Sequence, residues 1–483
     1  MKCSELIRIL AIALARPAYA RYNRTGTMLS PACFKDLDVS FKNGISYDDY
    51  IFAWNARLAN VVAGAVVRPK NEAQVIQAVK CAADRTSISV RSGGHSYEGY
   101  WRGDENGLVV DLRNMNNIVV DKEKKQVAVQ AGALLGKMLA TLWKEDKGVL
   151  PHGLQGIVGV GGMALGGGFG LLSRNYGLLV DRVVSLRIVD ASGKLLSVDE
   201  NNNKDLFFAL RGAGGGNFGV VTEITFSYIK HEQDFTVVRY NWNTGKNNFT
   251  EIVHSVMDYY SSTPPNGAGH YLNLSPGGDI EFGITYSDEY KDHDGHIKKL
   301  EKILKKWDRK DLQRKDWIEA YLFFAGYGGV PDEGDIDTLF NIQSMTDKSF
   351  YKAKSGFLKE RISDATINKL RDILVEPGDG LFVLIDLWGG VIPGKKGTAF
   401  DNRDKFALVQ IGQTDAGAGE LLKKTYAAFQ SSFVGAYQNY IDAEELDFKK
   451  VYYPKSLLQL QKIKARYDPS DVFHFDMSIP VAT

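Results

Sequence analysis

Short apolar runs alternate with one amphipathic segment in the first part of the chain. The β-branched run at 61–67 and the run at 87–90 have the composition of buried strands. Between them Asn71 can cap a helix, because the apolar residues at 75, 76, 79 and 82 recur at helical spacing. The pattern predicts a strand, a helix and a second strand in succession, and this unit runs directly into a glycine-rich loop.

The length and spacing of the apolar runs change beyond this unit. Further short strands are expected at 108–112, 117–121, 126–130 and 221–227, with an amphipathic helix over 132–148. From about residue 231 the runs are longer and favour antiparallel strands, as at 236–242, 271–275, 279–287 and 406–412. Helices are expected at 294–307, 365–374, 415–432 and 454–466. The pattern therefore predicts an α+β protein with two folding units.

Composition excludes several classes of protein. The 483 residues suffice for two or three folding units, and 44% hydrophobic with 24% charged residues excludes a mainly disordered chain. A net charge of +1 argues against a dedicated nucleic-acid-binding surface, which needs a concentrated basic face. The sequence contains no HExxH motif and no GxSxG before a helix, so neither a zinc site nor a serine nucleophile is expected.

The N-terminus has the pattern of an exported protein. Residues 6–15 form an apolar run that is too short to span a membrane, and the small-x-small triplet at 18–20 follows it. This favours a secretory signal peptide, although Arg8 within the run leaves a plain N-terminal helix as the alternative.

Cysteines and sequons agree with export. If Cys3 is removed with the signal, Cys33 and Cys81 remain as an even pair, which in a secreted protein suggests one disulfide. Sequons begin at Asn23 and Asn248, and a weaker one at Asn273 is followed by proline. We expect a secreted glycoprotein without a membrane span.

Glycines are concentrated in three stretches that carry the chemistry. They read RSGGHSYEG at 91–99, GVGGMALGGGFG at 159–170 and LRGAGGGNFGVVT at 210–222. Glycine lets the backbone approach a ligand closely and exposes its N–H groups. The GxGxxA string at 159–164 is not read as a Rossmann fingerprint, because a poor strand precedes it and three glycines at 166–168 would break its helix. A glycine-rich loop laid along a pyrophosphate fits better.

These motifs, with YQNY at 437–440 and YDPSDVFHFDMSIP at 467–480, closely resemble the berberine bridge enzyme-like flavoproteins. That family belongs to the vanillyl-alcohol oxidase superfamily with the PCMH-type FAD-binding fold. The resemblance extends over nearly the whole chain from about residue 30. It implies a leader over 1–27, an FAD-binding domain over 28–230, a substrate-binding domain over 231–430, and a segment over 431–483 that returns to the FAD domain. The Cys33 and Cys81 positions resemble the disulfide pair of the plant members.

The resemblance implies that His95 is joined covalently to the 8α-methyl group of FAD. A second, cysteinyl bond is not expected, because Gln155 stands at the position of that cysteine and Met163 at the usual histidine position. Without the motif, His95 would be an ordinary loop histidine. The other residues that the resemblance places at the cofactor are Arg91, Ser92, Gly93, Gly94, Ser96, Gly159, Gly161, Gly162, Gly219, Val221 and Asn439.

Two residues are the candidates for catalysis. Tyr440 lies on a strand expected at 437–440 and resembles the family's base, which would have to have a lowered pKa to act near neutral pH, although it could be an ordinary sheet tyrosine. Asp386 lies in the apolar run FVLIDLWGG, so burial of its carboxylate implies either a partner or a role in the reaction. The adjacent Trp388 could stack on a sugar, with a core tryptophan as the alternative.

The resemblance implies a monomeric oxidase that acts on a small-molecule hydroxyl, with hydride transfer to FAD N5 and O₂ reduced to H₂O₂. Val158 stands at the oxygen-gatekeeper position, where valine resembles the oxidases, although it could be an ordinary core residue. The favoured substrate is the anomeric C1 hydroxyl of a cellobiose-like reducing oligosaccharide, oxidised to the lactone. Alternatives are oxidation of a monolignol-like aromatic allylic alcohol or an alkaloid, and a flavin-containing binding protein without catalysis.

Overall fold

The computed structural model describes residues 29–482, except 43, 45–46, 48–50, 59–62, 244–247, 263, 305, 326–335, 337–338, 340–348 and 379. The expected signal peptide and the Asn23 sequon lie outside these residues. Within them, no helix is long and apolar enough to cross a membrane.

The first strand–helix–strand unit is confirmed. A four-stranded sheet has the order β1-β2-β4-β3, in which β2 (Ala65–Val67), β4 (Leu108–Asp111) and β3 (Ile88–Arg91) run parallel and β1 (Val39–Phe41) pairs antiparallel at the edge. Helix α3 (Glu72–Ala82) connects β2 to β3, and the Asn71 side chain accepts a hydrogen bond from Gln74 N at its start. A disulfide joins Cys33 to Cys81 of α3, as expected.

A second, five-stranded antiparallel sheet adjoins the first. Its order is β5 (Ile118–Asp121), β6 (Gln126–Gln130), β10 (Val220–Ser227), β8 (Val183–Val189) and β9 (Leu195–Asp199). Helices α4 (Leu135–Asp146) and α7 (Lys204–Ala213) accompany it, and β7 (Gly148–Val149) pairs with β11 (Ile229–Lys230).

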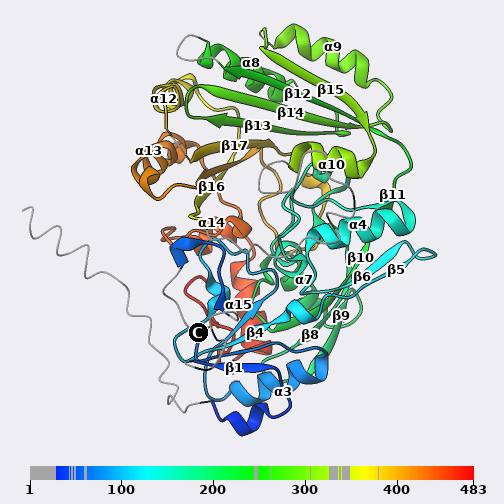
Figure 1. Cartoon of the computed structure of the whole chain (residues 1–483), viewed down its shortest axis with the longest axis vertical. Coiled ribbons are helices and arrows are strands. Elements are labelled where there is room, and N and C mark those ends of the chain that lie inside the picture. The colour runs from blue at the N-terminus through cyan, green and yellow to red at the C-terminus, as the bar shows by residue number, and fades with distance from the viewer. Residues whose placement is uncertain are drawn as a thin grey trace, which may run out of the picture.

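The C-terminal segment packs into the core of these two sheets. One apolar cluster joins residues between 29 and 228 to residues between 436 and 479, including side chains of α14 (Phe448–Tyr452) and α15 (Leu457–Tyr467). Lys464 of α15 is fully buried, and its ammonium donates to Asp468 and to the backbone oxygens of Asn217 and Phe473. Figure 1 shows α14 and α15 in red among the blue and green N-terminal elements.

The chain between these parts forms a seven-stranded antiparallel sheet. Its order is β15 (Arg309–Lys315), β12 (Phe235–Asn243), β14 (Asp279–Ser287), β13 (Ala268–Ser275), β17 (Leu381–Leu387), β18 (Ala407–Gln413) and β16 (Lys352–Leu358). Helices α8 (Phe249–Ser261), α9 (His293–Ile303), α12 (Asp364–Leu374) and α13 (Gly419–Phe429) form an apolar core on one of its faces (Figure 1). Helix α10 (Trp317–Ala325) belongs to another apolar cluster, with Tyr271 and Leu384 of the sheet.

The period of two along β17 decides where Asp386 points. Ile385 and Leu387 belong to the helix-covered core, so Asp386 lies on the opposite face of the sheet, toward the FAD-binding half. Further apolar clusters join residues from both sides of position 230, and the domain boundaries expected at 230 and 430 stay a prediction.

One strand was missed and one expected strand was wrong. The expected helix over 294–307 ends at Ile303 and is followed by β15, an edge strand whose sequence RKDLQRK is mostly exposed and has no apolar alternation. The segment expected as a strand at 437–440 is instead a single 3-10 turn, Gln438–Tyr440, closed by a hydrogen bond from Tyr440 N to Tyr437 O. Its two tyrosines, Tyr437 and Tyr440, stand three residues apart and line the site from a turn.

Candidate active site

The three glycine motifs and the C-terminal turn meet at one cavity of about 270 Å³. Its lining includes most of the expected site residues: Ser92, Gly93, Gly94, His95, Ser96, Val158, Gly159, Gly161, Gly162, Gly219, Val221, Asn439 and Tyr440. Met163 also lines it, whereas Arg91 and Asp386 are not among the described residues that do. Segments that are more than 300 residues apart in the sequence therefore converge on this cavity.

Arg91 packs against the first glycine loop without lining the cavity. Its guanidinium lies over the ring of Trp101, 4.1 Å from the centroid, and 3.8 Å from the Asp111 carboxylate. Burial lowers the pKa of Arg91 to about 10. Gly94 has φ +71°, and a β-carbon there would lie 2.7 Å from Arg91 Nε, so only glycine fits this turn against the arginine.

The glycine loops leave open space where a ligand would lie. A β-carbon on Gly93 would collide with the backbone of Gly159, so these two loops touch backbone to backbone. In contrast, a β-carbon on Gly162 or Gly215 would meet nothing within 4 Å, because both positions face the cavity. Such a cradle of exposed backbone fits the phosphates of a dinucleotide.

His95 has a free ring nitrogen at the cavity. Its imidazole stacks on the indole of Trp54 with 4.6 Å between ring centroids, and its buried Nε2 has no hydrogen-bond partner among the described residues. Burial lowers the pKa of His95 to about 4, so the ring is neutral at physiological pH. A neutral imidazole whose Nε2 has no partner beside the glycine cradle is compatible with attachment to FAD, and the residues present therefore fit that cofactor.

Tyr440 belongs to a cluster of stacked phenols. Its ring is nearly parallel to that of Tyr97, at 5.6 Å, and edge-on to that of Tyr437, at 4.9 Å. The Tyr437 hydroxyl accepts hydrogen bonds from Gly168 N and from the Asn439 amide, and the same amide donates to Met163 O. Asn439 thus fastens the C-terminal turn to the second glycine motif.

The electrostatic environment of Tyr440 differs from the one expected. Burial, reinforced by Tyr97, Asp386 and Tyr437, raises the pKa of Tyr440 well above its ordinary value, so the phenol is protonated at rest. Burial also raises the pKa of Asp386 to about 7. The sequence predicts an acid near Tyr440. It does not predict that the pKa values of Tyr440 and Asp386 are both raised, because the cause is desolvation, which depends on how the two halves pack.

Trp388 is a core residue. It is 1% exposed, stacks on Phe169 with 4.7 Å between centroids, and donates from its indole nitrogen to Arg403 O. It therefore has no free face for a sugar. This agrees with the alternative interpretation of Trp388 as a core tryptophan.

Several polar groups of the site escape the sequence analysis. The Gln410 amide of β18 donates to the hydroxyls of both Tyr97 and Tyr351, at 2.9 Å each. Tyr97 stands two residues after His95 and could have been suspected from that spacing, whereas Gln410 and Tyr351 carry no local signal. In the described part of the chain, no cluster of three His, Cys, Asp or Glu could hold a metal.

Comparisons with known proteins agree with this geometry. Residues 63–199 match the FAD binding domain family and residues 436–480 match the family described as berberine and berberine like. An uncharacterized FAD-linked oxidoreductase of Bacillus subtilis is 30% identical over 86% of this chain and 90% of its own. A xylooligosaccharide oxidase of Thermothelomyces thermophilus is 28% identical over 93% and 97% of the two chains.

A solved structure shares the whole architecture. That of Physcomitrella patens BBE-like 1 superimposes with a TM-score of 0.86 at 28% identity, covering 95% of this chain and all of the other. The chain therefore belongs to the berberine bridge enzyme-like family of FAD-linked oxidoreductases, with the two-domain α+β architecture of the PCMH-type FAD-binding fold.

Proposed function

We propose that this enzyme oxidises the anomeric hydroxyl of a reducing oligosaccharide to the lactone and passes the electrons to O₂, giving H₂O₂. The observation that carries the proposal is the placement of Asp386, whose pKa is about 7, close enough to Tyr440 to raise the pKa of that phenol at the edge of the cavity. The relative named a xylooligosaccharide oxidase supports a sugar as the substrate.

The chain's own residues supply the binding of the cofactor. Bound FAD provides the acceptor for the hydride that leaves the sugar carbon. The exposed backbone around Gly162 and Gly215 holds its phosphates, and His95 Nε2 or Nδ1 provides one covalent bond. Gln155 has no sulfur, so the tether is single.

The tyrosine and the aspartate act together on the hydroxyl proton. A phenol with a raised pKa is a poor base alone, because its anion would be buried beside Tyr97 and Tyr437. The Tyr440 oxygen accepts the substrate proton as the phenol's own proton passes to the Asp386 carboxylate. The net result is a neutral carboxylic acid and a neutral phenol, so neither side chain is left as an anion in the buried site. A pKa near 7 suits Asp386 to this role.

Two further assignments accompany the proposal. Val158 lines the cavity, and in this proposal it admits O₂. The enzyme acts as a monomer. We also propose passage through the secretory pathway, which the Cys33–Cys81 disulfide and the exposed sequon at Asn248 support. The Asn273 sequon lies in β13 with that residue 9% exposed, so it is not a glycan acceptor.

A substrate panel tests the proposed function. Purified holoenzyme is mixed anaerobically with reducing di- and oligosaccharides, aromatic allylic alcohols and an alkaloid, and flavin bleaching is recorded, followed by H₂O₂ release after air is admitted. We expect bleaching and H₂O₂ with at least one oligosaccharide. Bleaching by the alcohols alone would favour the aromatic alternative, and no bleaching by any compound would favour a binding protein.

The variant Asp386→Asn tests the aspartate. The rate of flavin reduction in the wild type should rise with pH through about 7, as the carboxylate ionises. In Asp386→Asn this inflection should disappear and the rate should fall by about 10²-fold. Stopped-flow reduction between pH 5 and pH 9 measures both.

Stability provides the control for Asp386. Because its folded pKa lies above the unfolded value of about 3.9, the wild type loses stability as pH rises from about 4 through 7. Asp386→Asn should therefore unfold at a higher temperature than the wild type at pH 8, even though its flavin is reduced more slowly. A variant that is both less stable and unchanged in pH profile would show that the aspartate is structural.

A further inference from the structure

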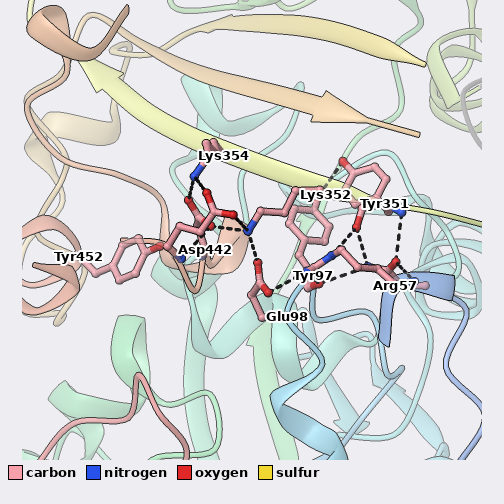
Figure 2. Close-up of polar contacts among 10 residues, drawn as sticks. Arg57, Tyr97, Glu98, Tyr351, Lys352, Lys354, Asp442 and Tyr452 are labelled. Carbon is pink, nitrogen blue, oxygen red and sulfur yellow. Dashed lines mark hydrogen bonds and ion pairs between the residues drawn. The ribbon is translucent and has the colours of Figure 1, made fainter. Parts of the chain in front are cut away.

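Three tyrosines of the site are each followed closely by a charged residue. Glu98 follows Tyr97, Lys352 follows Tyr351, and Asp442 stands two residues after Tyr440. These pairs come from the first glycine loop, from the edge strand β16 and from the C-terminal turn. Figure 2 shows Glu98, Lys352 and Asp442 pointing toward one another, with Tyr97 and Tyr351 at the neighbouring positions.

Lys352 is the centre of this charged cluster. Its ammonium lies 2.7 Å from Glu98 Oε1 and 2.5 Å from Asp442 Oδ1. The three side chains are 8%, 4% and 9% exposed, respectively. Among the described ion pairs, Lys352 is the only side chain that joins the His95 loop to the Tyr440 turn through both carboxylates (Figure 2).

The neighbouring cations contact only one side each. Lys354 lies 2.7 Å from Asp442 Oδ2 and 2.6 Å from Glu444, but among the described residues it forms no ion pair with Glu98. Arg57 lies 2.7 Å from Glu98 Oε2, on the side of the His95 loop. Lys354 and Lys352 are equally exposed and both pair with Asp442, so Lys354 is a matched reference for Lys352.

Buried ion pairs are a costly way to stabilise a fold. Their desolvation cancels much of the attraction, and well-packed apolar residues of similar size often do as well. Their distinctive property is a fixed geometry, because each charge must keep its partner. Here that geometry is imposed one residue from Tyr97 and two residues from Tyr440, whose rings lie parallel at 5.6 Å.

We propose that Lys352 is a positioning residue for the oxidation: it ties the Tyr97 segment to the Tyr440 segment and holds the Tyr440 hydroxyl at the cavity. The proposal rests on the proposed role of Tyr440. Misplacing a reacting group by about 1 Å can cost 10²-fold in rate without loss of binding. The effect of Lys352 should therefore appear in the rate of the chemical step more than in sugar affinity.

The test compares Lys352→Met with Lys354→Met as holoenzymes. With a sugar that bleaches the wild type, Lys352→Met should slow flavin reduction at saturating sugar about tenfold or more, with the apparent sugar Kd changed by less than about threefold. Lys354→Met should stay within about twofold in rate, although it also leaves a buried carboxylate with fewer partners. Lys352→Arg should recover much of the rate.

Two readouts separate positioning from simple loss of stability. The triple variant Glu98→Gln, Lys352→Met, Asp442→Asn has no unpaired charge in this link, so its melting temperature should recover while its rate should not. Hydrogen exchange should accelerate at both 96–99 and 438–443 in Lys352→Met, but only at the second segment in Lys354→Met.

The outcomes distinguish this proposal from the proposed function. Equal rate losses in the two methionine variants, a rate that recovers with stability in the triple variant, or unchanged exchange at 96–99 would each overturn the positioning role. Failure of the wild type to be bleached by any panel compound would instead contradict the proposed function. The exchange data alone would then test whether Lys352 links the Tyr97 segment to the Tyr440 segment.

Discussion

Replacement of Tyr440 by phenylalanine should slow flavin reduction by about 10²–10⁴-fold while FAD stays bound. The phenol oxygen is the group that receives the substrate proton in the proposed reaction, and no other hydroxyl of the stacked cluster is free to take its place. Tyr437 already accepts two hydrogen bonds, and Tyr97 accepts one from Gln410. The ring itself remains, so its contacts with Tyr97 and Tyr437 should hold the turn in place.

Anaerobic stopped-flow spectroscopy measures this effect directly. Tyr453→Phe is the control, because Tyr453 also lines the cavity and is 6% exposed, but follows α14 in the chain, whereas the reacting turn precedes it. Its rate should remain close to that of the wild type. A Tyr440→Phe enzyme with more than a tenth of the wild-type rate would remove this tyrosine from the proton transfer.

Replacement of His95 by alanine should abolish the covalent retention of flavin. The wild type, precipitated with acid, should keep its yellow colour in the pellet, whereas His95→Ala should release all its flavin into the supernatant. The cause is the loss of the unpartnered ring nitrogen at the cavity, with the indole of Trp54 left without its stacking partner. The absorbance of pellet and supernatant at the flavin maximum gives the bound fraction.

Gln155→Ala is the control for the single tether. Gln155 has no nucleophilic atom that would form a second flavin bond, so this variant should retain its flavin in the pellet like the wild type. A wild-type protein that loses its colour on acid treatment would falsify the covalent assignment, while leaving the noncovalent FAD site intact.

The sequence predicts most of the architecture because the signals are local. The Asn71 cap, the apolar run around Asp386 and the glycine stretches each specify a feature within a few residues. Strand β15 escaped because an exposed edge needs no apolar alternation. The turn at 438–440 escaped because no glycine or proline within it marks a turn, and its shape depends on tertiary contacts such as the one from Tyr437 N to Ser355.

The site likewise contains some residues that the sequence predicts and others that it does not. Residues in glycine motifs could be placed at the cofactor from the sequence, since a glycine run has few other uses. The cluster around Lys352 could not, because its members are charged residues 254 and 90 positions apart that look solvated until the fold buries them. The raised pKa of Tyr440 was likewise beyond the sequence, because desolvation depends on packing between distant segments.

The shared core of the N-terminal sheets and the C-terminal segment also constrains how the protein matures. Residues 436–479 supply side chains to that core, and Lys464 links α15 to the loop at Asn217. A nascent chain on the ribosome therefore cannot complete the flavin site until residues 436–479 have left the exit tunnel. Cofactor loading must follow synthesis of this segment, and a message truncated near residue 430 would yield a colourless product however well its central sheet folds.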